Sequence, residues 1–236
     1  MKNKYSFFTK CLVIALFFIT FLGCEEKSME IPYYEFSLVS KYKKESIVAF
    51  MDYNSDNRLS EFNIYVNESS IGRSPVKYTS SYISCTINDV MYHIQLSNTR
   101  GGIRAESVRV STLEGVRLYY IEYWYDDAGR VNKARLDGID IMPIWNHYKY
   151  EGNTIIIDDA GTEYRLELSS EENLGYVCNV LDYANAPITS NYIFNPYLYF
   201  LKIYGTPVNM LPSGQEIVHC NNNKNLSRVG KHYYEY

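Results

Sequence analysis

The sequence lacks the short motifs by which common catalytic and nucleotide-binding sites are recognised. It contains no GxSxG nucleophile elbow, no HExxH zinc motif, no P-loop and no GxGxxG turn. Its four histidines are scattered, and no two of them are four residues apart. Triad or zinc chemistry would therefore need a site that only the fold assembles. We expect a protein that is not an enzyme and that has no cofactor.

Basic residues are also in short supply. Lysine and arginine number 23 against 27 aspartates and glutamates, which gives a net charge of −4. The densest basic cluster, residues 41–44, is typical of a solvated strand edge. The sequence offers no basic stripe for a phosphate backbone, and this disfavours a nucleic-acid partner.

The longest apolar run, residues 11–22, is too short for a transmembrane helix, which needs about 20 residues. It follows a basic segment, residues 1–10, as in a signal peptide. Residues 21–24 resemble a bacterial lipobox, with phenylalanine where leucine is usual. The resemblance implies that residues 1–23 are removed and that Cys24 carries a lipid. An ordinary secretory signal with an unrelated cysteine is the alternative.

The segment after Cys24 is short and polar. Residues 24–32 are expected to tether a single β-rich domain, residues 33–236, to the membrane. The acidic pair directly after Cys24 resembles the surface-export signal of Bacteroidota lipoproteins. We therefore expect an outer-membrane lipoprotein, and the sequence leaves open whether it faces the cell exterior or the periplasm.

Three cysteines remain in the expected domain: Cys85, Cys178 and Cys220. Their number is odd, so at most one disulfide can form within the chain. They form no CxxC pair, and we interpret them as structural, buried cysteines.

Tyrosine is the residue in excess, with 25 copies against 10 phenylalanines and 2 tryptophans. From residue 33 onward, aromatic and β-branched residues recur between clusters of Gly, Asn and Asp, which is typical of strands and turns. The pattern predicts an all-β fold, mainly an antiparallel meander or a barrel-like sheet. The expected strands are residues 33–40, 46–53, 62–66, 78–87, 90–96, 108–112, 116–125, 131–136, 145–150, 154–157, 163–168, 216–220 and 226–236.

One or two short helices are expected near residues 170–204. Residues 174–181 carry apolar side chains at helical spacing after a pair of serines. Asn195 precedes a proline and so has the pattern of an N-cap, with Gly205 just past the end. Residues 197–204 are apolar enough to plug one end of a sheet or barrel.

Three segments share a turn pattern: residues 53–59, 125–131 and 157–162. In each of them an Asp or Asn can cap the turn through its side chain. In the first two, Asn57 and Gly129 stand at the position that needs a positive φ. We expect three hairpin turns of one type.

A calcium site is the metal alternative for the first of these turns. Asp52, Asn54 and Asp56 match the first ligands of an EF-hand loop. The glycine position of that loop holds Asn57, the twelfth position holds Asn63, and the flanks are strands rather than helices. Turn chemistry already accounts for these residues, so our main expectation is that no metal is bound.

The strand at residues 119–125 has aromatic side chains on both faces. Tyr120, Glu122 and Trp124 point to one side, because side chains alternate along a strand. Neither face is cleanly polar, and this favours a central strand that is covered on both sides.

The alternative is an open face. Trp145 and Tyr148, on the expected neighbouring strand, would then join Trp124 in a platform for sugar rings or for the apolar side chains of a partner. The competing interpretation is that residues 197–204 pack over Trp124 and bury it.

The YD-type turns, the Asn195-Pro196 segment and the lipobox together resemble a family of Bacteroidota lipoproteins of unknown function. That family is described as having a porin-like fold of meandering antiparallel strands, and the turns also resemble Rhs-type repeats. The resemblance covers residues 33–236. It implies a fold and a location, and it carries no known activity and no catalytic residues.

We therefore expect an outer-membrane or cell-surface lipoprotein that acts as a non-catalytic binding module for a glycan or a protein. One alternative is a carbohydrate-active hydrolase with a spatially assembled site. The carboxylate pairs Asp126-Asp127 and Asp158-Asp159 do not indicate that site, because neighbours on one turn diverge and turn chemistry accounts for both pairs. The other alternative is a small integral outer-membrane β-barrel, because the aromatic residues at 232–236 resemble a barrel-assembly signal.

Overall fold

The computed structural model divides the chain into two compact units, Met1–Glu30 and Ile31–Tyr236. It describes residues 41–44, 47–97, 104–139, 142–159, 161–176, 180–183, 190–220 and 226–233, all of them in the second unit. The expected signal peptide, Cys24, the tether and the first expected strand lie outside the described residues, and they stay predictions.

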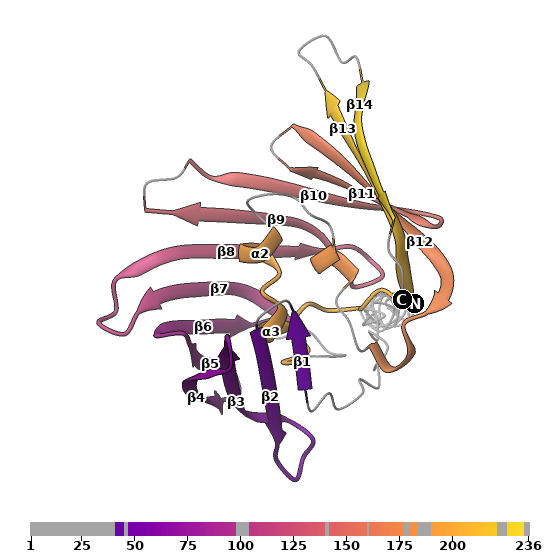
Figure 1. The fold of residues 1–236 in the computed structure, drawn as a ribbon. Helices are drawn as coiled ribbons and strands as arrows, with labels where there is room; N and C mark the ends of the chain where they lie inside the picture. The colour runs from indigo at the N-terminus through magenta and orange to yellow at the C-terminus, as the bar shows by residue number, and fades with distance from the viewer. Residues whose placement is uncertain are drawn as a thin grey trace, which may run out of the picture. The chain divides into compact units, whose positions relative to one another are not determined.

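The described residues form fourteen antiparallel strands in one sheet, in which each strand pairs with its neighbours in the sequence (Figure 1). The prediction of an all-β antiparallel meander is confirmed. In the described part of the chain, no helix is long and apolar enough to span a membrane. The strands are β1 (Lys41–Lys44), β2 (Ile47–Tyr53), β3 (Leu59–Val66), β4 (Ser69–Tyr78), β5 (Tyr82–Ile87), β6 (Val90–Leu96), β7 (Ala105–Thr112), β8 (Arg117–Tyr125), β9 (Val131–Gly138), β10 (Ile144–Glu151), β11 (Thr154–Asp159), β12 (Thr162–Glu172), β13 (Met210–Cys220) and β14 (Leu226–Tyr233).

In the part of the sheet whose side chains the structure describes, one face supplies the apolar core. On β5, the side chains of Ile83, Cys85 and Ile87 are buried, and those between them are half-buried. This alternation is that of a strand with one covered face, which we call the inner face, while the opposite one is the outer face. Burial raises the pKa of the Cys85 thiol to about 12, as expected for an unreactive structural cysteine.

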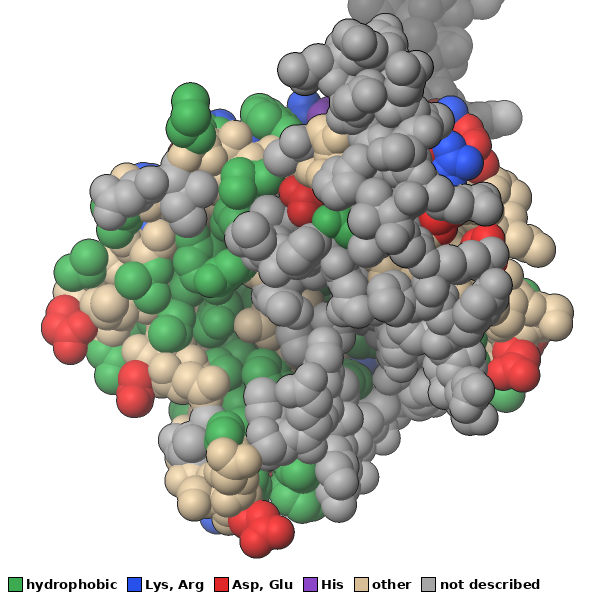
Figure 2. Space-filling view, turned by 45° about the horizontal axis from the view of Figure 1, so that its top comes forward, with side chains coloured by type: hydrophobic (Ala, Val, Ile, Leu, Met, Phe, Trp, Pro, Cys, Tyr) green, Lys and Arg blue, Asp and Glu red, His purple; other side chains and the backbone are tan. Residues whose placement is uncertain are grey.

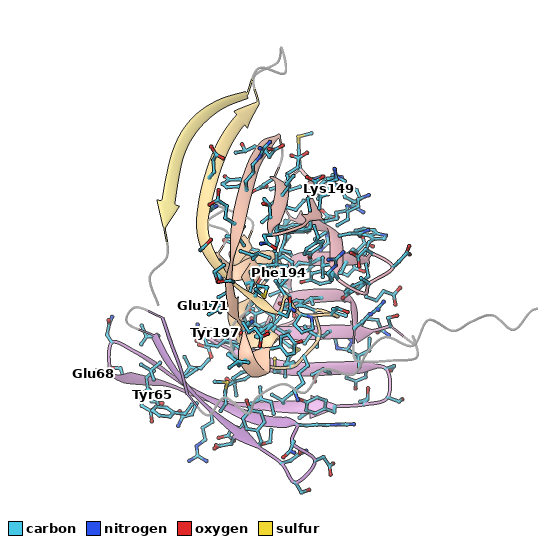
Figure 3. The ribbon with its side chains drawn as sticks, turned by 90° about the vertical axis from the view of Figure 1, so that its right-hand side faces the viewer. Tyr65, Glu68, Lys149, Glu171, Phe194 and Tyr197 are labelled. Carbon is cyan, nitrogen blue, oxygen red and sulfur yellow. The ribbon has the colours of Figure 1, made fainter. Side chains whose placement is uncertain are left out.

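The chain between β12 and β13 covers the inner face. It contains the 3-10 turns η1 (Leu174–Tyr176) and η2 (Val180–Tyr183) and the short helices α2 (Ser190–Ile193) and α3 (Pro196–Tyr199). We call residues 190–206 the plug segment. Figures 1 and 3 show it in the curve of the sheet.

Aromatic contacts hold the plug segment to the strands. The ring centroid of Phe194 lies 5.4 Å from that of Tyr148 on β10 and 6.4 Å from that of Tyr123 on β8. The hydroxyl of Tyr123 donates a hydrogen bond to the carbonyl of Ile193 at 2.5 Å. These apolar residues therefore cover the inner face of the sheet, whereas the sequence suggested that they plug one end of it.

The predicted helices are shorter than the sequence pattern indicates. Strand β12 continues to Glu172, and Leu174 is exposed, so the predicted helix at residues 174–181 is wrong. Gly175 has a φ of 62°, which interrupts helical geometry there. The N-cap at Asn195 is confirmed, because its side chain accepts a hydrogen bond from the N–H of Tyr197. The helix that it starts ends at Tyr199.

Two strand boundaries also differ from the prediction. The expected strand at residues 78–87 is two strands, β4 and β5, because a turn at Thr79 separates them. The hydroxyl of Thr79 accepts hydrogen bonds from the N–H groups of Ser81 and Tyr82. Strand β13 begins at Met210, where the sequence suggests a loop, and it pairs there with Glu172 of β12.

Two of the three YD-type turns have the same hydrogen bonds. In the β2–β3 turn, the N–H of Asn54 donates to the carbonyl of Arg58 at 2.9 Å, and the Asn54 side chain accepts the Arg58 N–H at 3.0 Å. In the β8–β9 turn, Asp126 and Arg130 form the same two bonds at 2.9 and 2.8 Å. The prediction of a common turn type is confirmed for this pair.

The third turn is different. Asn57 and Gly129 have φ values of 56° and 80°, as predicted. In the β11–β12 turn, however, Asp159 pairs directly with Thr162, so the loop is shorter. The Asp158 side chain there accepts a hydrogen bond from the N–H of Gly161. The prediction of one type for all three turns is therefore wrong.

A cation–π contact follows each of the two matching turns. The guanidinium carbon of Arg58 lies 5.7 Å from the ring centroid of Tyr78, and that of Arg130 lies 4.1 Å from the ring centroid of Tyr150. Each of these tyrosines also donates a hydrogen bond to a carbonyl 19 residues earlier in the chain. The two halves of the sheet thus repeat one unit of turn, arginine and tyrosine.

Candidate functional site

Two tryptophans meet on the outer face of the sheet. Trp124 comes from β8 and Trp145 from β10, and β9 lies between these strands. The two ring centroids are 5.5 Å apart, and the planes are tilted by 36°. Trp124 is 39 % exposed and Trp145 is 37 % exposed. An indole pair that keeps this much accessible surface can contact a ligand.

Trp124 stays partly exposed because the plug segment covers the opposite, inner face of β8. Its neighbour Tyr123 points inward, where the plug segment covers it. In the described part of the chain, the plug segment packs on this inner side. The expectation that β8 is covered on both faces is therefore wrong, and so is the interpretation that residues 197–204 bury Trp124.

Strand β9 adds cations to the tryptophan pair. Lys133 is the register partner of Trp124, and Arg135 is the register partner of Trp145. The Lys133 ammonium lies 4.0 Å from the ring centroid of Trp145 and 5.0 Å from that of Trp124. The guanidinium carbon of Arg135 lies 5.5 Å from the Trp145 centroid. We call these four residues the tryptophan site.

The carboxylates beside the site are already paired with Arg135. An oxygen of Glu122 lies 3.3 Å from one terminal nitrogen of Arg135, and an oxygen of Asp137 lies 3.4 Å from the other. All three side chains are about one-third exposed. These exposed pairs contribute little to stability, about 0–1 kcal/mol each, and they fix the position of the guanidinium at the edge of the site.

The structure brings together most of the residues predicted for a platform. Glu122, Trp124 and Trp145 lie on the outer face, with Tyr120 further along the same row of β8, half-buried and paired with Asp137. Tyr148 is wrong as a platform residue. It is buried on the inner face against the plug segment, because it stands three residues after Trp145 and so on the opposite side of β10.

Sequence reasoning missed Lys133 and Arg135. Both lie in the outer row of β9, which alternates with buried Ala134 and Leu136. The alternation is visible in the sequence. The contact with the tryptophans depends on the pairing register, which the sequence alone does not provide.

The residues of the calcium alternative belong to the β2–β3 turn. The Asn54 side-chain oxygen accepts hydrogen bonds from the N–H groups of Asp56 and Arg58, both at 3.0 Å. Asp52 and Asp56 are exposed. The described residues contain no group of three or more acidic, histidine or cysteine side chains placed to hold a metal ion. Asn54 therefore acts as the cap of the turn.

The plug segment leaves a small cavity beside β9. It has a volume of about 20 Å³ and is lined by Val131, Tyr150, Tyr204 and Thr206, among others. A cavity of this size holds a water molecule and is too small for a sugar. The burial raises the pKa of Tyr150 above its ordinary value.

The comparisons with known proteins support the fold. No protein-family model matches the chain, and no curated protein matches its sequence. Among solved structures, the chain is similar to a porin-like protein from Bacteroides uniformis ATCC 8492. The TM-score is 0.53 at 13 % sequence identity, and the match covers 87 % of this chain and 99 % of that one. The chain thus shares a porin-like fold of antiparallel strands.

Proposed function

We propose that the protein is a non-catalytic binding protein of the outer membrane or cell surface, anchored by a lipid on Cys24, and that it binds glycans at the tryptophan site. The observation that supports binding is the pair of partly exposed, adjacent indoles of Trp124 and Trp145 on the outer face. The observation that supports the location is the basic and apolar leader that ends at Cys24.

A sugar ring suits this pair of indoles. One side of many pyranose rings presents mainly C–H groups, which pack on an aromatic face, and the hydroxyls at the ring edge need hydrogen-bond partners. Glu122 and Arg135 lie beside the rings with part of their surface exposed. Their exposed oxygens and N–H groups can accept and donate these bonds.

The rigidity of the site also favours binding. Both tryptophans stand on strands in the interior of the sheet rather than on loops, and the Lys133 ammonium contacts both rings. Little conformational entropy remains to be lost when a ligand binds to side chains that are already in contact.

A glycan array with the full chain in mild detergent tests this proposal. Trp124→Ala should lower the affinity for the bound glycans at least tenfold, with the melting temperature changed by only a few degrees. The control is Phe50→Ala, because Phe50 is an exposed aromatic of β2, 41 % exposed, that pairs with Tyr65 away from the site. Equal binding by the parent and Trp124→Ala would refute the proposed site. Release of shorter sugars would favour the hydrolase, and capture of a protein instead of a glycan would favour a protein ligand.

A further inference from the structure

Lys133 lies at the tryptophan pair and differs from several nearby cations on the outer face, which are paired with carboxylates. Arg135 is paired with Glu122 and Asp137, and Lys149 of β10 is paired with Glu151. Arg165 of β12 lies 2.6 Å from an oxygen of Glu163. Among the described residues, Lys133 forms no such ion pair, and its contacts are the rings of Trp124 and Trp145.

The position of Lys133 holds a positive charge at the tryptophan pair. A strand fixes its backbone between the two indoles, and its side chain is half-buried. The negative face of an indole ring attracts an ammonium electrostatically. This attraction keeps the ammonium at the rings and still leaves it able to bind an anion, because the rings carry no negative charge.

We propose that the ligand of the tryptophan site is an acidic sugar, whose ring packs on the indoles while its anionic group pairs with Lys133. This inference rests on the proposed glycan-binding function and adds the chemical class of the glycan. A carboxylate or a sulfate on the sugar ring satisfies the geometry, since each lies at the edge of a ring whose C–H groups contact the indole. Such an ion pair is shielded from water by the indoles and the sugar, which strengthens it.

General attraction between the protein and anions does not account for such a preference. The chain has a net charge of −4, and acidic side chains are scattered over the face that Figure 2 shows. An acidic sugar is therefore repelled by the molecule as a whole and attracted at one point. The preference would come from Lys133, the cation that contacts both indoles, with Arg135 as a second, already paired cation.

Titration calorimetry with the full chain in mild detergent tests the inference. The probes are a galacturonic acid oligomer and its methyl ester, which share a ring and differ in charge, and dextran sulfate with dextran. The parent should bind one of the acidic probes at least tenfold more tightly than its neutral counterpart, and the two pairs distinguish carboxylate from sulfate. Lys133→Gln should abolish this preference, while Lys133→Arg should keep most of it.

Controls separate this inference from the proposed function. Lys149→Gln, on the same face but paired with Glu151, should leave the preference unchanged. Equal binding of acidic and neutral probes, or a preference that survives Lys133→Gln, would overturn the acidic-sugar inference and leave glycan binding in place. If the parent binds only the neutral probes and Trp124→Ala loses this binding, the acidic-sugar inference is overturned and glycan binding stands. No binding of any glycan by the parent would overturn both proposals.

Discussion

Gly129 lies where the β8–β9 turn meets the plug segment, and its substitution should destabilise the fold in a calculable way. A Cβ added there would lie 2.5 Å from Nη2 of Arg104 and 2.6 Å from the hydroxyl of Thr206. That hydroxyl donates a hydrogen bond to the carbonyl of Ala128 at 2.6 Å. The guanidinium of Arg104 lies 5.0 Å from the ring centroid of Tyr125. Gly129→Ala must displace both groups.

The cost has three parts. Gly129 has a φ of 80°, and a left-handed conformation costs a residue with a Cβ about 1–2 kcal/mol. Loss of the Thr206 hydrogen bond costs about 0.5–1.5 kcal/mol, and loss of the Arg104 cation–π contact about 0.5–1 kcal/mol. Gly129→Ala should therefore destabilise the protein by roughly 2–4.5 kcal/mol.

Gly115 provides the matched control. Its φ of 86° is nearly the same, and no atom lies within 4 Å of an added Cβ. Gly115→Ala should cost only the backbone strain, about 1–2 kcal/mol. Urea unfolding of both variants and the parent measures the difference, provided that the slope with urea is unchanged. Equal losses for the two variants would refute the conclusion that the plug segment packs tightly on the β8–β9 turn.

Three further predictions concern other parts of the chain. Asn57→Gly should leave the melting temperature unchanged or slightly raised, because glycine adopts the positive φ of this turn without strain; a clear drop would contradict the turn geometry. Cys24→Ala should release the protein from the membrane fraction or leave an uncleaved precursor, and a processed variant that stays in the membrane would argue against lipidation. Burial raises the pKa of Tyr148 and Tyr150, so their neutral forms favour the folded state. The stability that these two neutral phenols contribute should be fully present below about pH 10 and should be lost as the pH rises further. Ultraviolet titration should show these phenols ionising only as the protein unfolds. Ionisation of every tyrosine near pH 10 in the folded protein would contradict a buried inner face.

Local chemistry explains what could be predicted from the sequence. The turn at Asn57 and the turn at Gly129 are determined by a capping side chain and a residue that tolerates positive φ, all within a few positions. The N-cap at Asn195 is similarly local. Alternation along the strands predicts the sheet, because neighbouring strands in a meander are also neighbours in sequence.

The exposure of the tryptophan site could not be predicted in this way. Both faces of β8 are aromatic, with Tyr123 on one and Trp124 on the other, so composition does not indicate which is covered. The answer depends on where residues 190–206 dock, which is a long-range packing choice. The error at Tyr148 is different, since the alternation of β10 places it opposite Trp145 and the sequence already carried that information.

The plug segment also determines which surface remains for other molecules. It belongs to the longer connection between β12 and β13, whose two ends are joined where the N–H of Asn173 donates to the carbonyl of Asn209 at 2.8 Å. A peptide tethered at both ends has an effective concentration in the millimolar range at its own binding surface. The plug segment thus competes with any other ligand for the inner face. A free ligand would have to displace Phe194 and its aromatic neighbours from this position, whereas the outer face requires no such exchange.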